Sequence, residues 1–79
     1  MQKIEVYSMG YCPYCKAAKR LLKALNWTFT EYEITGRPRK RDEMIRRTGR
    51  QTVPQIFINS QHIGGFDDFS AYVQDKELI

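Results

Sequence analysis

Residues 3–25 read KIEVYSMGYCPYCKAAKRLLKAL, and the spacing of the apolar side chains changes halfway along this stretch. Residues 3–8 alternate apolar and polar side chains, as the residues of a strand do. From Pro13 onward the apolar residues recur at helical spacing, and proline suits a first helical turn because its missing N–H costs no hydrogen bond there. We therefore predict a strand at residues 3–8, a loop, and a helix at residues 13–25.

The rest of the sequence continues this exchange of strand-like and helix-like patterns. We predict further strands at residues 28–34, 53–58 and 61–63, a second helix at residues 38–48 that Gly49 ends, and a last helix that Asp67 or Asp68 caps. The order β-α-β-α-β-β-α begins with a parallel crossover, and its hairpin adds an antiparallel strand. The sequence therefore predicts an α/β fold with a four-stranded mixed β-sheet flanked by three helices.

Length and composition are those of a small globular protein. The 79 residues are enough for one domain, which we take to span residues 1–79, and 42% hydrophobic with 28% charged residues is a globular balance. No apolar run approaches the roughly 20 residues of a membrane span. The first residues, MQKIEV, carry charge where a signal peptide needs an apolar stretch. We expect a cytoplasmic protein without a membrane segment.

The net charge of +4, from 13 basic and 9 acidic side chains, favours small anions and leaves nucleic acid open on charge alone. Many of the basic side chains fall within residues 37–50. Such a run could meet phosphates or an acidic protein, but it is more often a solvated helix face. It also lacks the interleaved aromatic residues on which single-stranded nucleic acid stacks. We expect no nucleic-acid partner.

Both cysteines lie in one short motif, Cys12-Pro13-Tyr14-Cys15. A disulfide between them would close about four residues and stabilise the fold by only about 2 kcal/mol, which is little for a structural cross-link. On a helical wheel Cys12 falls near the lysine-rich side and Cys15 near the apolar side. We predict that Cys12 is exposed at the helix start and that Cys15 is turned inward, which suits redox chemistry.

The start of a helix favours a thiolate. Its N–H groups and the helix dipole attract an anion, and such settings lower a thiol pKa from about 8.5 to between about 3.5 and 7.5. Lys16 and Lys19 add positive charge one turn away. These features predict an attacking Cys12 and a resolving Cys15.

Three other interpretations of the cysteines stay open. They could be half of a zinc site, although zinc normally takes four ligands and His62 is the only other soft candidate. They could be unreactive core residues, because free cysteine is often buried, or they could form a purely structural disulfide. We expect no metal site.

Two further segments stand out, TVPQIFI at residues 52–58 and GGFDD at residues 64–68. Together with the Cys12-Pro13-Tyr14-Cys15 motif, in this order and at these spacings, they resemble a dithiol glutaredoxin of the thioredoxin-like superfamily over nearly the whole chain. The resemblance implies a thioredoxin-like fold. It also implies a glutathione-dependent thiol–disulfide oxidoreductase that reduces protein disulfides and glutathione mixed disulfides, with glutathione as co-substrate and no bound cofactor.

The resemblance also implies roles for residues near the cysteines. Pro54 would be cis and face Cys12, the Val53 backbone would pair with the cysteinyl part of glutathione, and Tyr14 would line the groove. Backbone N–H groups around Phe66 would hold the γ-glutamyl carboxylate, while an acidic residue beside them could attract the α-amino group. The implied glutathione-binding residues are Tyr14, Arg41, Thr52, Val53, Pro54, Gly65, Phe66, Asp67 and Asp68. Without the resemblance, these segments would be an ordinary strand entry and a helix cap.

Arg41 is expected on the inward face of the second helix, because it precedes Met44 and Ile45 by three and four residues. Such an arginine either pairs with a carboxylate in the groove or covers the core edge with its stem, and the residues themselves leave both open. In glutaredoxins this position commonly contacts the glycine carboxylate of glutathione. Arg37 is a second candidate from the preceding loop.

One position departs from the family pattern. Many glutaredoxins have a lysine three residues before the first cysteine, where this chain has Met9. A cation near the thiolate and the glutathione carboxylate is therefore missing. We expect either that Arg41, Arg37 or the Lys16 region replaces it, or that glutathione binds more weakly.

Other functions compete with this one. The chain could be recharged by a thioredoxin reductase, two chains could share an iron–sulfur cluster through Cys12 and glutathione, or the basic residues could bind nucleic acid. The GGFDD segment and Arg41 favour glutathione, and Pro13 disfavours the cluster by family pattern. We expect a monomer whose partners are glutathione and disulfide-bearing or glutathionylated proteins, with ribonucleotide reductase among the candidates.

Overall fold

A four-stranded mixed sheet lies at the centre of the structure, a computed structural model that describes residues 2–77. The elements are β1 (Ile4–Ser8), α1 (Pro13–Ala24), β2 (Thr30–Glu33), α2 (Pro38–Thr48), β3 (Gln55–Ile58), β4 (Gln61–Gly64) and α3 (Phe66–Glu77). The strand order is β2-β1-β3-β4, in which β2 runs parallel to β1 while the β1–β3 and β3–β4 pairs are antiparallel. The predicted α/β fold, with a mixed sheet and three helices, is confirmed.

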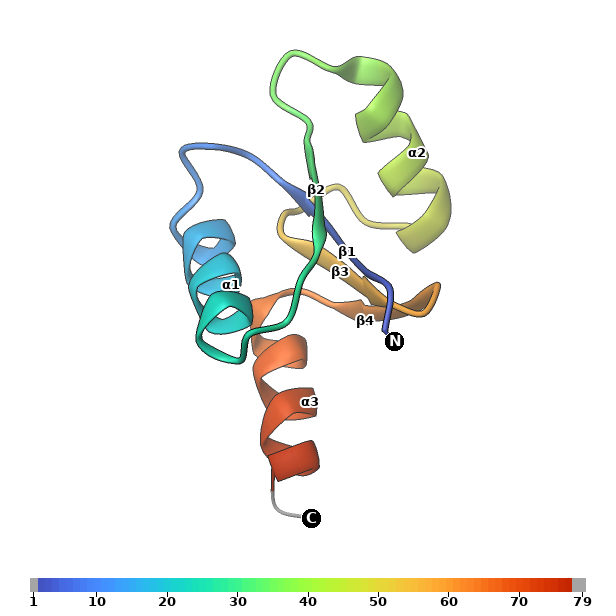
Figure 1. The fold of residues 1–79 in the computed structure, drawn as a ribbon. Coiled ribbons are helices and arrows are strands. Elements are labelled where there is room, and N and C mark those ends of the chain that lie inside the picture. Colours follow the sequence, from blue (N-terminus) through green and yellow to red (C-terminus); the bar gives the residue numbers. More distant parts are fainter. Residues whose placement is uncertain (1, 78–79) are drawn as a thin grey trace.

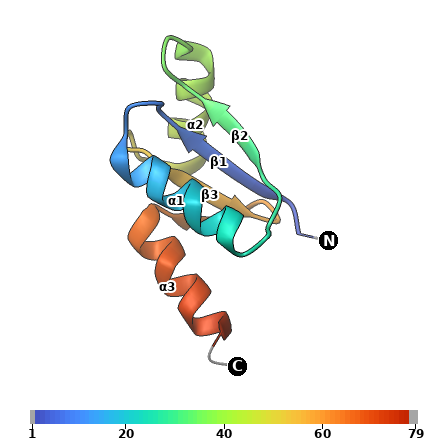
Figure 2. The same ribbon diagram turned by 60° about the vertical axis from the view of Figure 1, so that its left-hand side comes forward.

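Helices cover both faces of the sheet, so the molecule has three layers. Helices α1 and α3 pack on one face and α2 lies on the other (Figures 1 and 2). The larger core cluster lies on the α1 and α3 side and contains Ile4, Val6, Ala18, Leu22, Ile56, Ile58, Phe69 and Val73. The smaller cluster lies on the α2 side and contains Tyr7, Ile34, Met44 and Phe57. Every residue of β1 is therefore buried, and the alternation in its sequence separates two covered faces.

A group of polar side chains lies beneath α2, and we call it the α2 polar cluster: Glu5, Tyr7, Tyr32, Glu43 and Arg47. The Arg47 guanidinium donates to the Glu5 carboxylate at 3.2 and 3.3 Å and to the Tyr7 hydroxyl at 2.8 Å. Burial raises the pKa of Glu5, but hydrogen bonds from Arg47 and Tyr32 outweigh this, and the pKa lies below its ordinary value. The cluster lets a central strand carry a glutamate that is only 5% exposed.

The starts of β3 and α3 differ from the prediction, and the end of α2 agrees with it. β3 begins at Gln55 because Pro54 has no N–H for a neighbouring strand, which leaves Val53 outside the sheet. α3 begins at Phe66, so the expected caps Asp67 and Asp68 lie inside its first turn. Gly49 ends α2 in the left-handed conformation, with φ of 71°, as predicted.

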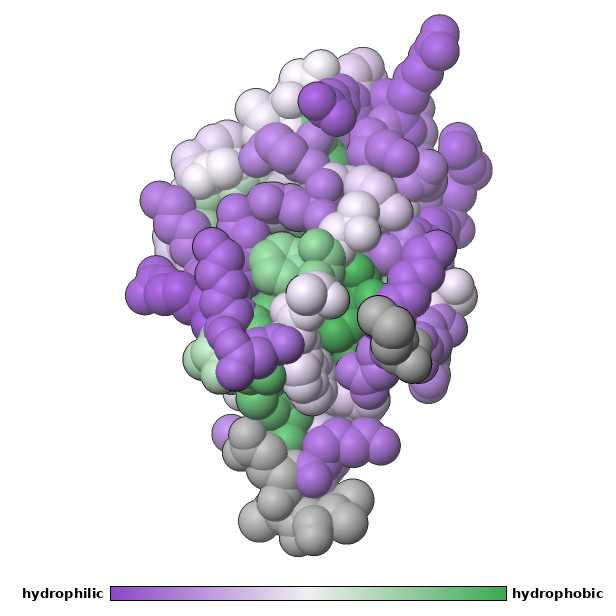
Figure 3. Space-filling view, in the orientation of Figure 1, coloured by the Kyte–Doolittle hydropathy of each residue, from purple (hydrophilic) through white to green (hydrophobic). Residues whose placement is uncertain are grey.

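Polar residues dominate the surface over α2 and over the outer side of α1 (Figure 3). Arg39 and Arg46, from the basic run on α2, are exposed, which agrees with a solvated helix face. Within residues 2–77, no helix combines the length and the apolar character needed to cross a membrane.

Candidate active site

Cys12 lies at the start of α1, where it is the N-cap residue. Its Sγ accepts a hydrogen bond from the backbone N–H of Cys15 at 3.3 Å, and its thiol donates to the Val53 carbonyl oxygen at 3.7 Å. Pro13 occupies the first helical turn, as the sequence predicts. The Cys12 side chain is half-buried, so its sulfur lies between the helix start and the loop before β3.

Cys15 is the buried partner. Its side chain is fully shielded from solvent, whereas that of Cys12 is partly exposed, and both are free thiols. Burial, and next to it the adjacent Cys12 sulfur, raise the pKa of Cys15 to about 12. Cys15 is therefore a thiol at neutral pH, and its burial confirms the predicted inward orientation.

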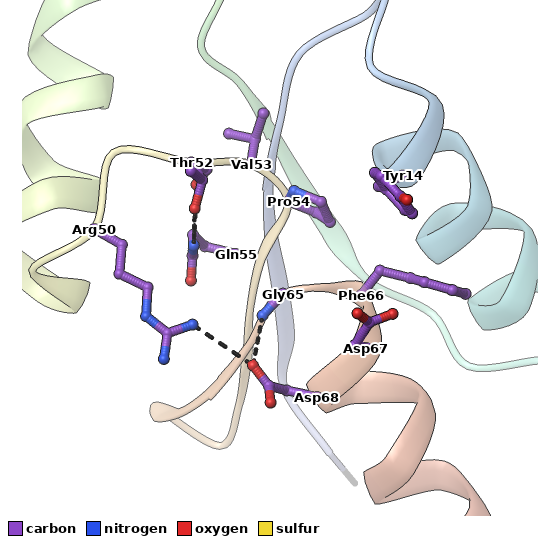
Figure 4. Close-up of a pocket in the computed structure, with 10 residues that line it drawn as sticks. All are labelled: Tyr14, Arg50, Thr52, Val53, Pro54, Gln55, Gly65, Phe66, Asp67 and Asp68. Atoms are coloured by element: carbon purple, nitrogen blue, oxygen red, sulfur yellow. Dashed lines mark hydrogen bonds and ion pairs between the residues drawn. The ribbon is translucent and has the colours of Figure 1, made fainter.

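A groove of about 210 Å³ lies between the loop before β3 and the start of α3 (Figure 4). Its lining residues are Tyr14, Arg50, Thr52, Val53, Pro54, Gln55, Gly65, Phe66, Asp67 and Asp68. Val53, whose carbonyl accepts from the Cys12 thiol, is one of these residues. The structure thus brings together, from three separate parts of the chain, every predicted glutathione-binding residue except Arg41. The Val53–Pro54 peptide bond is cis, as the resemblance implies.

A buried side chain holds the loop wall of the groove. The Gln55 amide nitrogen donates to the backbone carbonyl of Thr52 at 3.0 Å and to its hydroxyl at 3.2 Å. The Gln55 amide oxygen lies 2.7 Å from Nε2 of His62 on the neighbouring strand. Burial lowers the pKa of His62, so this ring is neutral at neutral pH and donates through Nε2 to Gln55. This pair was not predictable from the sequence, because it depends on the register between β3 and β4.

The start of α3 forms the opposite wall. Gly65 precedes the helix, and its carbonyl accepts the first helical hydrogen bond from Phe69 at 2.9 Å. The Asp68 carboxylate reaches back to the N–H of Gly65 at 3.3 Å. A Cβ at Gly64 would overlap this carboxylate, and φ there is +129°, so both the backbone and the space require glycine. Gly64 and Gly65 therefore allow the Asp68 side chain to pack against the backbone at the edge of the groove.

Of the three residues expected to replace the missing lysine at position 9, one lies near the loop that borders the groove and two lie on the surface. Arg41 donates to the Gln51 amide oxygen at 3.5 Å, next to the loop but outside the groove lining. Arg37 is exposed and precedes α2 without a side-chain cap bond, and Lys16 lies on the outer face of α1. Met9 packs against the smaller core cluster.

Arg50 is the cation that does line the groove, and it forms an ion pair with Asp68 at 3.5 Å. In the sequence, Arg50 belongs to the basic run that is expected to form a solvated helix face. The only feature of the sequence that links Arg50 to the groove is its position two residues before Thr52. That position does not by itself distinguish a groove residue from a surface residue.

Exposed tyrosines surround the cysteine motif. Tyr11 and Tyr14 are 70% and 63% exposed, and the Tyr14 ring lies 6.3 Å from that of Phe66 across the groove. Large exposed aromatic rings are typical of surfaces that bind a partner. In the part of the chain that the structure describes, no three His, Cys, Asp or Glu side chains are grouped to hold a metal ion.

Comparisons with known proteins agree with this geometry. The family model described as Glutaredoxin matches residues 4–63. The chain is similar to Glutaredoxin 3 of Escherichia coli (strain K12), with 54% identity over 71 residues that cover 90% of this chain and 86% of the relative. Among solved structures, the chain is similar to the buckwheat glutaredoxin–glutathione complex, with a TM-score of 0.85 and 30% identity over 98% of this chain and 73% of the other. It is also similar to glutaredoxin 1 from Francisella tularensis complexed with cacodylate, with a TM-score of 0.83 and 38% identity over 99% of this chain and 98% of the other.

Proposed function

Because the chain belongs to the glutaredoxin family and is therefore a thiol–disulfide oxidoreductase, we propose that it uses glutathione to reduce protein disulfides and glutathione mixed disulfides. The observation that carries this proposal is the position of Cys12. Its sulfur accepts an N–H at a helix start and contacts Val53, which lines a groove together with all the other residues implied to bind glutathione except Arg41. The similarity to a glutaredoxin solved with glutathione supports the choice of thiol.

Cys12 is the attacking residue and Cys15 the resolving one. The Cys12 sulfur is partly exposed, while the Cys15 sulfur is buried and protonated at neutral pH. Attack requires a thiolate, access to the disulfide and a leaving thiol. Of the two sulfurs, only that of Cys12 meets the requirement for access.

With a glutathionylated substrate, the Cys12 thiolate attacks the glutathione sulfur and releases the substrate thiol. A second glutathione thiolate then attacks the Cys12–glutathione disulfide, which yields oxidised glutathione and regenerates the Cys12 thiolate. With a protein disulfide, Cys12 forms a mixed disulfide with one substrate sulfur. Cys15 then attacks the Cys12 sulfur, its proton passes to the departing substrate thiolate, and two glutathione molecules reduce the resulting Cys12–Cys15 bond.

The groove residues hold the glutathione moiety. The Val53 backbone, outside the sheet, pairs with the cysteinyl unit, and Thr52 and Pro54 shape the same wall. The helix start at Gly65, Phe66 and Asp67 offers backbone N–H groups to the γ-glutamyl carboxylate, and Asp68 attracts the α-amino group. Tyr14 covers the groove. Arg41 lies outside the groove lining and donates to Gln51, which precedes Thr52 of the groove wall. From there it binds the glycine carboxylate.

Several further features belong to the same proposal. Residues 1–79 act as a single glutaredoxin domain that works as a monomer in the cytoplasm, without a resident cofactor. Its protein partners carry disulfides or glutathionylated cysteines, and ribonucleotide reductase is one candidate.

A comparison of electron donors tests the proposal. A glutathionylated peptide is incubated with the protein and either glutathione with glutathione reductase or a thioredoxin reductase, and NADPH consumption is followed. We expect turnover with the first system and little with the second. Equal or faster turnover with the thioredoxin reductase would overturn the assignment of glutathione as the donor.

A further inference from the structure

A second polar group lies on the α1 side of the sheet, and we call it the Ser8–Glu31–Lys19 network. The Ser8 hydroxyl donates to the Glu31 carboxylate at 2.6 Å, and the Lys19 ammonium donates to the same oxygen at 2.8 Å. Ser8 is fully buried on β1, whereas the side chains of Lys19 and Glu31 are 23% and 33% exposed. The network therefore runs from the core to the edge of the sheet and ends in an ammonium group that is held in place.

Lys19 lies one helical turn after Cys15 on α1. Residues four apart on a helix are neighbours on its surface. The bond to Glu31 on β2 draws the Lys19 side chain toward the sheet, which is the side on which Cys15 is buried. Lys16 and Lys23 on the same helix are exposed. The contact with Glu31 therefore distinguishes Lys19 from these two lysines and keeps its charge near the buried thiol.

Cys15 faces groups from several elements. The core-facing residues of α3 are apolar, and β1 contributes the Ser8 hydroxyl. The edge strand β2 contributes Glu31, which is paired with Lys19. The adjacent Cys12 sulfur, at the start of the same helix, is a further titratable group. Lys19 therefore brings a positive charge to surroundings that are otherwise apolar, neutral or acidic.

These groups act on the Cys15 thiol in opposite directions. Burial and the Cys12 sulfur raise its pKa to about 12, while a hydrogen bond from the Met9 backbone and the charge of Lys19 act to lower it. A charge acts more strongly inside a protein than in water, because less solvent screens it. Without Lys19, the Cys15 sulfur would therefore hold its proton more tightly.

We propose that Lys19, which Glu31 holds in place, is a positioning residue for the resolving step, in which its ammonium stabilises the thiolate of Cys15. This inference rests on the proposed function, in which Cys15 resolves the mixed disulfide. Cys15 loses its proton, and its sulfur forms a bond to the Cys12 sulfur while the bond between Cys12 and the substrate sulfur breaks. The departing substrate thiolate takes up the proton. Lys19 keeps its own proton throughout.

Such a role affects only one of the two reactions. Reduction of a protein disulfide needs Cys15, whereas removal of glutathione from a substrate needs Cys12 alone. Loss of the Lys19 charge should therefore slow the first reaction at the step after the mixed disulfide forms, and it should leave the second reaction intact. A residue that only stabilised the fold would affect both reactions.

Single-turnover reduction of a cyclic peptide disulfide tests the proposal. The fully reduced protein is mixed with the peptide in the absence of glutathione, and the reaction is stopped with acid at set times. Mass spectrometry then measures the mixed disulfide and the released dithiol peptide. The variants are Lys19→Met and the conservative Lys19→Arg, and Lys23→Met, which removes an exposed lysine from the same helix, is the matched control. Thermal unfolding checks that each variant is folded.

We expect Lys19→Met to resolve the mixed disulfide about three- to tenfold more slowly, because the greater nucleophilicity of a more basic sulfur offsets only part of the lost thiolate. The mixed disulfide should accumulate, and the variant should reach the wild-type rate only at higher pH. Lys19→Arg should restore most of the rate, since arginine keeps the charge. Lys23→Met should match the wild type, and deglutathionylation with glutathione as donor should be unchanged in all three variants.

Resolution at the wild-type rate in a folded Lys19→Met variant, or an equal loss of deglutathionylation, would overturn the inference. A Lys19→Arg variant as slow as Lys19→Met would overturn it as well, because the charge would then have no effect. A wild type that reduces the peptide disulfide but is not recycled by glutathione would instead overturn the proposed function and leave this inference standing.

Discussion

The Sγ of Cys12 accepts a 3.3 Å hydrogen bond from the backbone N–H of Cys15, so the first cysteine caps the helix that buries the second. The same peptide segment therefore directs a backbone N–H at one sulfur and removes the other from water. This difference in environment, rather than the presence of two cysteines, separates the roles that we propose for them.

Alkylation measures that difference directly. With iodoacetamide near neutral pH, we expect Cys12 to be modified while Cys15 stays unmodified, because burial shields Cys15 and raises its pKa to about 12. Peptide mass spectrometry identifies the labelled sulfur. The Cys12→Ser variant should be nearly unreactive while folded and should label readily in denaturant. Comparable labelling of both cysteines in the native protein would contradict the structure.

A cation at position 9 tests whether the missing family lysine matters. Met9 lies three residues before Cys12, and its carbonyl accepts the Cys12 N–H at 3.1 Å. We expect Met9→Lys to lower KM for glutathione severalfold and to make turnover more sensitive to salt, since an exposed charge is screened. Met9→Leu is the neutral control. Unchanged KM and salt dependence in Met9→Lys would show that this position has no influence on binding.

The α2 polar cluster stabilises the fold through Arg47. Arg47→Met leaves the Glu5 carboxylate buried without its cation, and we expect the free energy of unfolding to fall by about 2–4 kcal/mol, slightly less than for a fully buried pair. The Arg47 side chain is 28% exposed, which is why the loss should be smaller. Denaturant titration gives the value, and Glu5→Gln in the same chain should restore part of it. Wild-type stability in Arg47→Met would rule out this role.

The same pair makes stability depend on pH. The pKa of folded Glu5 lies below the ordinary 4.5, so the folded state favours the carboxylate. Its contribution is therefore complete above pH 4.5 and is lost as the pH falls through the lower, folded pKa. We expect Arg47→Met to lose less stability than the wild type over this acidic range, because the contribution is already absent. Parallel pH profiles for the two proteins would contradict this.

Gln55 positions the loop wall of the groove. Gln55→Met keeps the size of this 1% exposed side chain but removes both hydrogen bonds to Thr52. We expect KM for a glutathionylated peptide to rise severalfold with a smaller change in kcat, because the loop binds the substrate but does not react with it. Gln61→Met, at an exposed position of β4, is the control. A lower kcat at unchanged KM would assign Gln55 a different role.

The fold was largely predictable from the sequence, because most of its helices and strands carry apolar side chains at helical or alternating spacing. The errors fall at boundaries that depend on single backbone groups, such as the missing N–H of Pro54 and the start of α3 at Phe66. The groove required more than periodicity. Its three segments are far apart in the sequence, and only their resemblance to a family indicated that they meet.

Arg50 and the Gln55–His62 pair were not predicted. An arginine that follows a basic helix has the same local pattern whether it faces solvent or a groove, and its ion pair with Asp68 depends on the placement of α3. The bond between Gln55 and His62 depends on the register of β3 against β4, which includes an irregularity between Ile56 and Phe57. Contacts of this kind are properties of the assembled fold.

Deglutathionylation by the two single cysteine variants tests the central claim most directly. With a glutathionylated peptide and glutathione as donor, Cys15→Ser should retain this activity, because Cys12 alone carries both exchange steps, while Cys12→Ser should have none. Cys15→Ser should in turn lose turnover of a protein disulfide that requires resolution. A folded Cys12→Ser variant that still removes glutathione from the peptide, or a folded Cys15→Ser variant that does not, would contradict the account.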